Sequence, residues 1–110
     1  MRMPSAERAV IDPVKLTDYC LNPDHPRGRH KARVFESALG LTSDDADELR
    51  QALLDAALDD TAELADADDF GQRYVVEFAM NALAGTARIR SAWIVRADED
   101  FPRFVSCYVI

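Results

Sequence analysis

The spacing of apolar residues changes near residue 60, and this change constrains the fold more than any other feature. Between Ser43 and Leu58 apolar side chains recur every three or four residues, which predicts a helix with Ser43 as its N-cap. After Asp60 apolar and polar residues alternate, as in strands with one buried face. Helices followed by consecutive strands predict an α+β fold. We expect two or three N-terminal helices packed on one face of a four-stranded antiparallel meander sheet, because parallel strands would need helices between them.

The alternating half of the chain divides into four predicted strands. Their ranges are Thr61–Ala65, Gln72–Met80, Thr86–Arg96 and Pro102–Ile110. Short turns separate the first three strands, and an acidic loop precedes the last. In the last strand two sets of side chains alternate and should lie on opposite faces, Val105, Cys107 and Val109 against Phe104, Ser106 and Tyr108.

One register of the two long strands satisfies both faces of the sheet. It places Tyr74 opposite Trp93, so we expect Trp93 to be buried beside that ring. On the other face the same register places Glu77 opposite Arg90, which is a favourable cross-strand charge pair. The two outcomes support each other and predict a long hairpin at the centre of the sheet.

The N-terminal half is predicted to hold the other helices. Residues 1–13 contain two prolines and little periodicity, so we expect a loosely held arm of a single domain that spans residues 1–110. Val14–Leu21 fits a short helix. The next helix begins near His30 and ends before Gly40, a residue that tolerates the left-handed conformation common after helices.

Cations gather at the start of this helix, although the chain has a net charge of -7. They are Arg27, Arg29, His30, Lys31 and Arg33. A helix N-terminus is partly positive, so each cation there costs a few tenths of a kcal/mol, roughly. One interpretation is an anion site in which Arg27, Arg29 and His30 bind phosphate beside free N–H groups. The other is that the arginines are solvated and pair with three nearby acids, Asp18, Asp24 and Glu36.

Several functional classes find no support in the sequence. Cys20 and Cys107 are far apart and fit no metal spacing, so we expect buried, reduced thiols in a cytoplasmic protein without a metal site. Neither a glycine-rich nucleotide loop nor a serine nucleophile motif occurs, and we expect no cofactor. No apolar run approaches the roughly 20 residues of a membrane span, and the first ten residues lack a signal-peptide core, so we expect no membrane partner.

The loop before the second helix carries a specific motif. It reads NPDHPRGRHKARVF, and the strings FGQRYVVEF, SAWIVR and CYVI follow later. From Ile11 onward the chain resembles the bacterial family called domain of unknown function six thousand eight hundred eighty-three. That family's motif is N-P-x-H-P-x-G-x-x-K-A-x-x-F, and every fixed position is filled here, including His25 and Lys31. The resemblance implies a small bacterial protein encoded beside another small protein, its candidate partner, with similar modules at the C-termini of secreted toxins.

The predicted element order is also similar to the ribonuclease superfamily that includes barnase, colicin nucleases and RelE-type messenger-RNA toxins. RNA cleavage without a metal ion needs an acid, a base and cations that stabilise the phosphorane. Either histidine, His25 or His30, fits the acid or base. Lys31 or Arg73 fits the phosphate ligand. Tyr108 or Tyr74 fits a stacking or proton-donating group. Such toxins are usually basic, whereas this chain is acidic.

Two functional hypotheses follow. The first is a ribonuclease-like toxin domain of a toxin–antitoxin or polymorphic-toxin system, which acts on RNA. It expects His25, Lys31 and Arg73 to converge in one open cleft, with His25 more important than His30. The alternative is a non-catalytic interaction module, such as an antitoxin or an immunity-type partner. It expects a closed, paired set, in which His25 bonds to its own loop and Arg73 pairs with an aspartate of the preceding turn.

Overall fold

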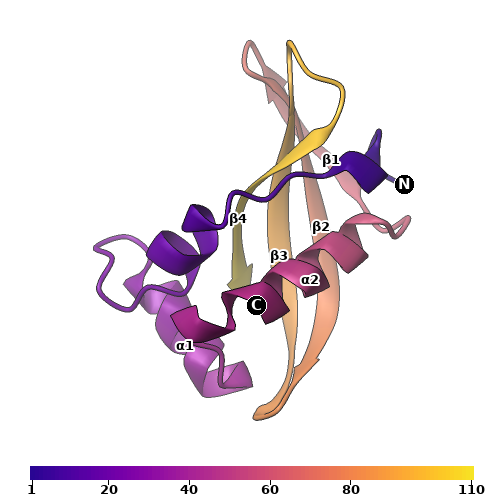
Figure 1. Cartoon of the computed structure of the whole chain (residues 1–110). Helices are drawn as coiled ribbons and strands as arrows, with labels where there is room; N and C mark the ends of the chain where they lie inside the picture. The colour runs from indigo at the N-terminus through magenta and orange to yellow at the C-terminus, as the bar shows by residue number, and fades with distance from the viewer.

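The computed structural model describes all 110 residues, and its element order confirms the predicted α+β fold (Figure 1). Helices α1 (Arg29–Leu39) and α2 (Ala46–Ala57) precede strands β1 (Glu63–Asp68), β2 (Gly71–Ala82), β3 (Gly85–Arg96) and β4 (Pro102–Val109). The strands form one antiparallel sheet in the order β1-β2-β3-β4. Shorter helical segments lie at Ala6–Arg8, Leu16–Cys20 and Ser43–Asp45. No helix is long and apolar enough to cross a membrane.

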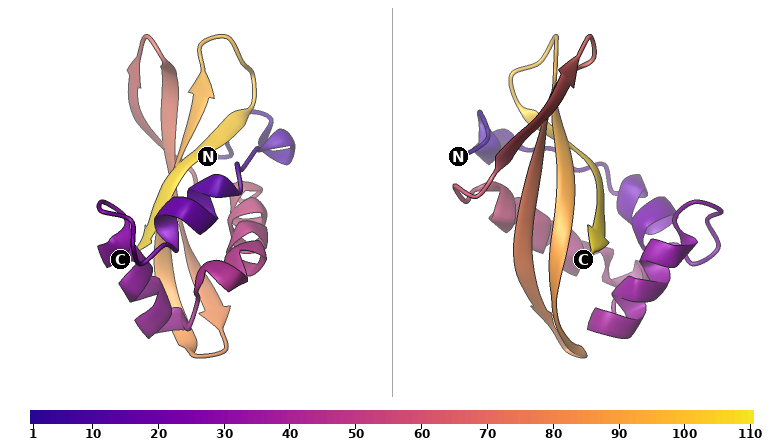
Figure 2. Two further views of the ribbon diagram at one scale, coloured as in Figure 1. Left: turned by 60° about the vertical axis from the view of Figure 1, so that its left-hand side comes forward. Right: turned by 180° about the vertical axis from the view of Figure 1, so that it is seen from behind.

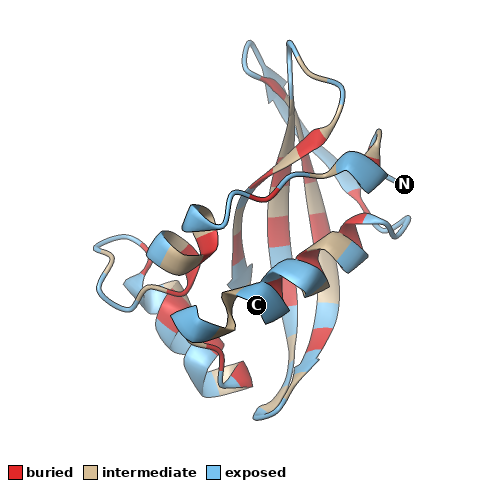
Figure 3. Cartoon of the chain, in the orientation of Figure 1, coloured by how far each residue is buried: buried red, intermediate tan, exposed pale blue.

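The helices pack on one face of the sheet and bury a single core. Helix α1 contacts β3 and β4, and α2 contacts β2. Seen from behind, the strands stand in front of α2, and no helix covers that side (Figure 2). Buried residues concentrate between the helices and the sheet (Figure 3). We call the uncovered side the open face; its side chains are Arg73, Val75, Glu77, Arg88, Arg90, Ala92, Ile94, Ser106 and Tyr108.

The predicted register of the central hairpin is confirmed. Tyr74 pairs with Trp93, and Glu77 pairs with Arg90. The Trp93 side chain is fully buried and packs edge-on against the Phe104 ring, with 5.5 Å between the ring centroids. Its indole N–H donates to the Ser91 hydroxyl at 2.9 Å, and that hydroxyl donates in turn to a β2 carbonyl at 2.7 Å. Every polar atom of this buried group is therefore satisfied.

The predicted alternation of side chains in β4 is confirmed for Ser106 and Tyr108 against Cys107 and Val109, but it fails at Phe104 and Val105, because the strand contains a bulge there. Ser106 pairs with Ala92, and Phe104 pairs with the next residue of β3, so Val105 has no partner. An unpaired residue shifts the alternation of the strand by one position. Phe104 and Cys107 are consequently both buried, and Val105 is exposed. Ser106 and Tyr108 follow the bulge in regular register and direct their side chains to the open face.

Two local boundaries differ from the prediction. The cap before α2 is Thr42 rather than Ser43: the Thr42 hydroxyl accepts from the Asp44 N–H at 3.3 Å, and the Asp45 carboxylate accepts from the Thr42 N–H at 2.9 Å. This reciprocal capping box satisfies two donors, which a cap at Ser43 would not. The first strand begins at Glu63 and extends into the segment that was expected to be a turn.

The N-terminal arm, expected to be loosely held, contributes to the core. Met3, Ala6 and Ile11 are buried. Val10 forms a parallel bridge with Arg103 of β4: its N–H donates to the Pro102 carbonyl at 2.9 Å, and its carbonyl accepts from Phe104 at 2.9 Å. The arm therefore covers the N-terminal part of the β4 edge.

Candidate functional site

The loop before α1 is organised by its own polar side chains. Asn22 accepts through its side-chain oxygen from the Asp24 N–H at 2.9 Å. The Nδ1 atom of His25 accepts from the N–H groups of Arg27 and Gly28, each at 3.0 Å. A nitrogen that accepts hydrogen bonds carries no proton, so in this geometry the ring N–H is the one on Nε2. His25 therefore builds the turn that leads into α1.

The same loop packs against the segment Leu16–Cys20. A Cβ atom on Gly28 would collide with the carbonyl oxygen of Tyr19, so only glycine permits this approach. The His25 ring meets the Tyr19 ring edge-on, with centroids 4.7 Å apart. These contacts fix the position of the first turn of α1 and hence of Lys31.

Lys31 extends from α1 across the edge of β4. Its ammonium donates to the hydroxyls of Ser106 at 3.4 Å and Tyr19 at 3.5 Å. It also lies 5.2 Å from the Tyr19 ring centroid and 5.7 Å from that of Tyr108, within cation–π range. None of the ion pairs involves Lys31. A half-buried ammonium without a carboxylate partner is available to bind an anion.

Three surface hollows meet at Lys31. One, of about 120 Å³, lies on the open face beside Arg90, Ser106 and Tyr108. A second, of about 260 Å³, lies between α1 and β4 and includes His30 and Tyr108. A third, of about 400 Å³, includes Lys15 and Tyr19. We call Lys31, Tyr108, Ser106, His30 and Arg90 the Lys31 site.

Arg90 brings a second cation to the open face. It lies opposite Tyr108 in the β3–β4 register, and its guanidinium is 3.6 Å from the carboxylate of Glu77 on the neighbouring strand β2. The central register predicted the contact between Glu77 and Arg90. Sequence reasoning did not assign Arg90 to the site, because it did not predict the β3–β4 register that places Arg90 opposite Tyr108.

The structure brings together only part of the predicted catalytic set. Lys31 and Tyr108 meet, with His30 beside them, whereas His25 lies behind Tyr19. Arg73 pairs instead with two aspartates of the β1–β2 hairpin, Asp68 at 2.7 Å and Asp66 at 3.8 Å. Its partner in β3 is four residues from Arg90, about 13 Å along the strand. The expected convergence of His25, Lys31 and Arg73 is therefore not present.

The arginines around α1 are exposed and unpaired. Arg27, Arg29 and Arg33 form no ion pair, so the proposed partners Asp18, Asp24 and Glu36 do not neutralise them. The helix start has no side-chain cap either. The first turns of α1 therefore carry unneutralised positive charge next to Lys31 in sequence. Whether it binds an anion there stays a prediction.

Two buried thiols lie beneath the site. The Cys20 sulfur is 3.9 Å from the Ser106 hydroxyl. A hydrogen bond from Cys107 lowers the pKa of Cys20 to about 7, and the Lys31 charge adds to this effect, while burial opposes it. The same coupling and burial raise the pKa of Cys107 well above its ordinary value. No group of three or more histidine, cysteine, aspartate or glutamate side chains is placed to hold a metal ion.

A solved structure shares this fold. It is a chain of the contact-dependent growth inhibition toxin–immunity protein complex from Klebsiella pneumoniae 342, with a TM-score of 0.72 and 16% sequence identity. The alignment covers 92% of this chain and 99% of that chain. No curated protein matches the sequence at a significant level. The family described as Domain of unknown function (DUF6883) matches residues 2–110. The chain therefore belongs to this family of unknown function.

Proposed function

We propose that this chain is a ribonuclease-like toxin domain of a toxin–antitoxin or polymorphic-toxin system, which cleaves RNA without a metal ion at the Lys31 site. The observation that carries the proposal is the environment of Lys31. Its ammonium lies between two tyrosine rings, has no carboxylate partner, and borders three hollows. The shared fold with a toxin–immunity complex supports the biological setting.

The chemistry divides among neighbouring side chains. Lys31 and Arg90 stabilise the negative charge that develops on the phosphate. His30 and Tyr108 line one hollow with Lys31 and serve as the base and acid. One of them accepts the proton of the 2′-hydroxyl, and the other donates a proton to the leaving oxygen. The exposed Tyr108 ring also offers a surface on which a base can stack. Arg27 and Arg29 guide the anionic backbone toward α1.

His25 has an indirect role in this proposal. Its Nδ1 atom is occupied by two backbone N–H groups, and its ring lies against Tyr19 rather than in a hollow with Lys31. The accessible imidazole at the site is that of His30. The proposal therefore reverses the order of importance that the sequence suggested for the two histidines.

The test is cleavage of total RNA by the purified chain in the presence of a metal chelator. Lys31→Met keeps the unbranched apolar stem and removes the charge, so we expect a folded protein that does not cleave. The matched control is Arg33→Met, which removes an exposed, unpaired cation of the same helix and should leave cleavage near the wild-type rate. A Lys31→Met protein as active as wild type would overturn the assignment. A folded wild type without activity would favour the interaction module instead.

A further inference from the structure

The C-terminal half of β2 is a free sheet edge. Strand β1 pairs with β2 only from Gly71 to Val75, whereas β2 continues to Ala82. The Ala97 N–H donates to the Phe70 carbonyl, so these two residues form a hydrogen-bonded pair of the β2–β3 ladder. Hydrogen-bonded pairs alternate along an antiparallel ladder, and therefore the even-numbered residues of β2 bond to β3. The odd-numbered residues beyond Val75 therefore direct their backbone N–H and C=O groups outward; they are Glu77, Ala79 and Asn81.

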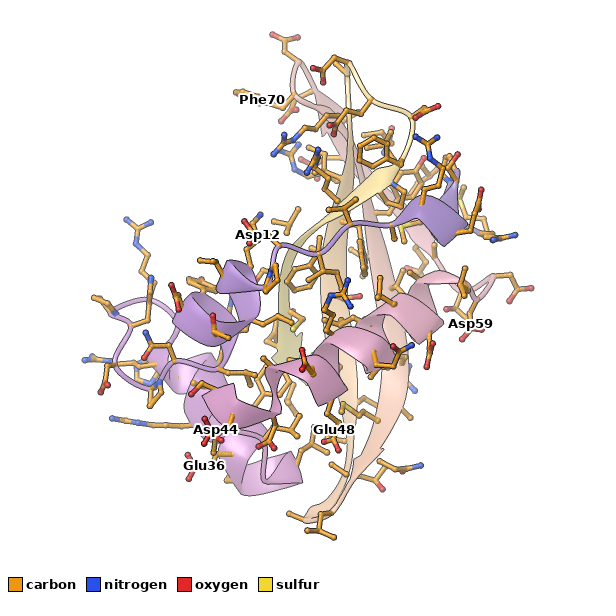
Figure 4. The ribbon with its side chains drawn as sticks, in the orientation of Figure 1. Asp12, Glu36, Asp44, Glu48, Asp59 and Phe70 are labelled. Atoms are coloured by element: carbon orange, nitrogen blue, oxygen red, sulfur yellow. The ribbon has the colours of Figure 1, made fainter.

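A groove runs beside this edge, between β2 and α2. Its volume is about 680 Å³. Its apolar part consists of Ala52, Ala56, Phe78, Ala79 and Met80. Glu48 and Asp55 line its helical side, because residues seven apart share one helix face, and Asp59 lines it just beyond the end of α2. Figure 4 shows Glu48 on α2 and Asp59 past its C-terminal end.

The three carboxylates have no cationic partner. None takes part in an ion pair, and the single side-chain contact among them is the hydrogen bond that Gln51 donates to Asp55 at 2.9 Å. Exposed strand edges in proteins are commonly blocked by lysine, proline or a covering segment. Here the edge has none of these and instead faces acidic side chains, a combination that suits pairing with a basic chain.

We propose that this groove binds an extended, lysine- or arginine-rich segment of a partner protein, which adds to the sheet as a strand along Glu77–Asn81. Backbone hydrogen bonds to the edge would supply affinity, and the carboxylates of the groove would select basic side chains. A second copy of the chain fits poorly, because a two-fold contact would set the same acidic residues against each other and the net charge is -7. Nucleic acid also fits this groove poorly, because the carboxylates of Glu48, Asp55 and Asp59 that line it would repel a phosphate backbone.

The probe is a short peptide of alternating lysine and valine, titrated into the isotope-labelled full chain and followed by nuclear magnetic resonance. We expect the amide signals of Glu77, Ala79 and Asn81 to shift and their hydrogen exchange to slow. A peptide in which alternate residues are N-methylated keeps the charge but cannot complete the ladder, and it should bind more weakly. Equal binding of both peptides, or shifts confined to other surfaces, would overturn the proposal.

Charge selection is tested with a triple variant. Glu48→Gln, Asp55→Asn and Asp59→Asn together should weaken the lysine–valine peptide by about tenfold, as expected for three exposed ion pairs. The matched control changes three exposed, unpaired acids elsewhere, Glu36→Gln, Asp69→Asn and Asp98→Asn, and should change affinity little. An equal loss in both triple variants would mean attraction by net charge alone and would refute the groove. Without peptide, hydrogen exchange at the amides of Glu77, Ala79 and Asn81 that slows further as protein concentration rises would show that a second copy occupies the edge.

Discussion

At the β4 edge of the sheet Lys31 places an unpaired ammonium between two tyrosine rings, whereas at the β2 edge three unpaired carboxylates line a groove. The β4 edge is partly covered by the N-terminal arm, and the C-terminal half of the β2 edge is free. Both edges flank the same core. One sheet therefore presents two surfaces of opposite charge.

This difference shows why the net charge of -7 is a poor guide to binding. Strands β2 and β4 are separated by two strand spacings, about 10 Å. The Debye length in physiological salt is about 8 Å. Exposed charges at one edge are therefore largely screened from the other, and a local cationic site can bind phosphate on an acidic protein.

The largest effect should come from the core that both edges share. Trp93→Ala removes a fully buried ring and the donor to Ser91, and we expect a loss of about 3–5 kcal/mol in the free energy of unfolding. Denaturant unfolding followed by circular dichroism measures it. Phe70→Ala is the matched control, because this aromatic ring is 74% exposed and its loss should cost little. A loss for Trp93→Ala below about 1 kcal/mol would argue against a common core.

The next effect separates the two edges by activity. Tyr108→Phe removes the phenol hydroxyl and keeps the ring that faces Lys31, so RNA cleavage should fall about 10²-fold in kcat if the hydroxyl transfers a proton. Glu48→Gln at the acidic groove should leave kcat unchanged. Single-turnover cleavage assays measure both variants. If Tyr108→Phe were fully active and Tyr108→Ala were not, the ring would act by stacking rather than by proton transfer.

The histidines should differ in stability. His25→Ala leaves the N–H groups of Arg27 and Gly28 without their acceptor, so we expect a loss of about 1–3 kcal/mol in the free energy of unfolding. His30→Ala removes an exposed side chain without hydrogen bonds and should change stability by less than about 0.5 kcal/mol while lowering activity. Chemical unfolding of both variants tests this contrast. An inactive His25→Ala protein of unchanged stability would restore the direct role that the sequence suggested.

The smallest effect concerns pH. The pKa of Cys20 is lowered from 9.0 to about 7, so its contribution to stability is present above pH 9.0 and is lost as pH falls through about 7. The pKa of Cys107 is raised, so its contribution is present below 9.0 and is lost at higher pH. Stability should therefore rise between neutral pH and pH 9.0 and decline beyond it. Thiolate absorbance should show one early titration that Cys20→Ser abolishes; an unchanged titration in that variant would contradict the assignment.

Local sequence determined much of this protein. The switch from helical to alternating spacing near residue 60 set the element types, because side-chain periodicity depends only on the conformation of each segment. The register that pairs Tyr74 with Trp93 followed from matching two neighbouring strands joined by a short turn. The histidine loop could be predicted as a rigid lead into a helix, since its prolines and Gly28 restrict or free the backbone locally. The pairing of Arg73 with a nearby aspartate was also one of the two alternatives that the sequence left open.

Tertiary structure alone decided the candidate site and the groove. The Lys31 site draws on Leu16–Cys20, α1, β3 and β4, and its composition depends on the β3–β4 register, which places Arg90 opposite Tyr108. The bulge at Val105 is likewise a property of two strands together, so the alternation of one strand could not reveal that Phe104 and Cys107 are both buried. The free β2 edge likewise exists because β1 stops pairing at Val75 while β2 continues to Ala82. Such features depend on where segments distant in the sequence meet in the fold, and short-range patterns of residues do not specify those contacts.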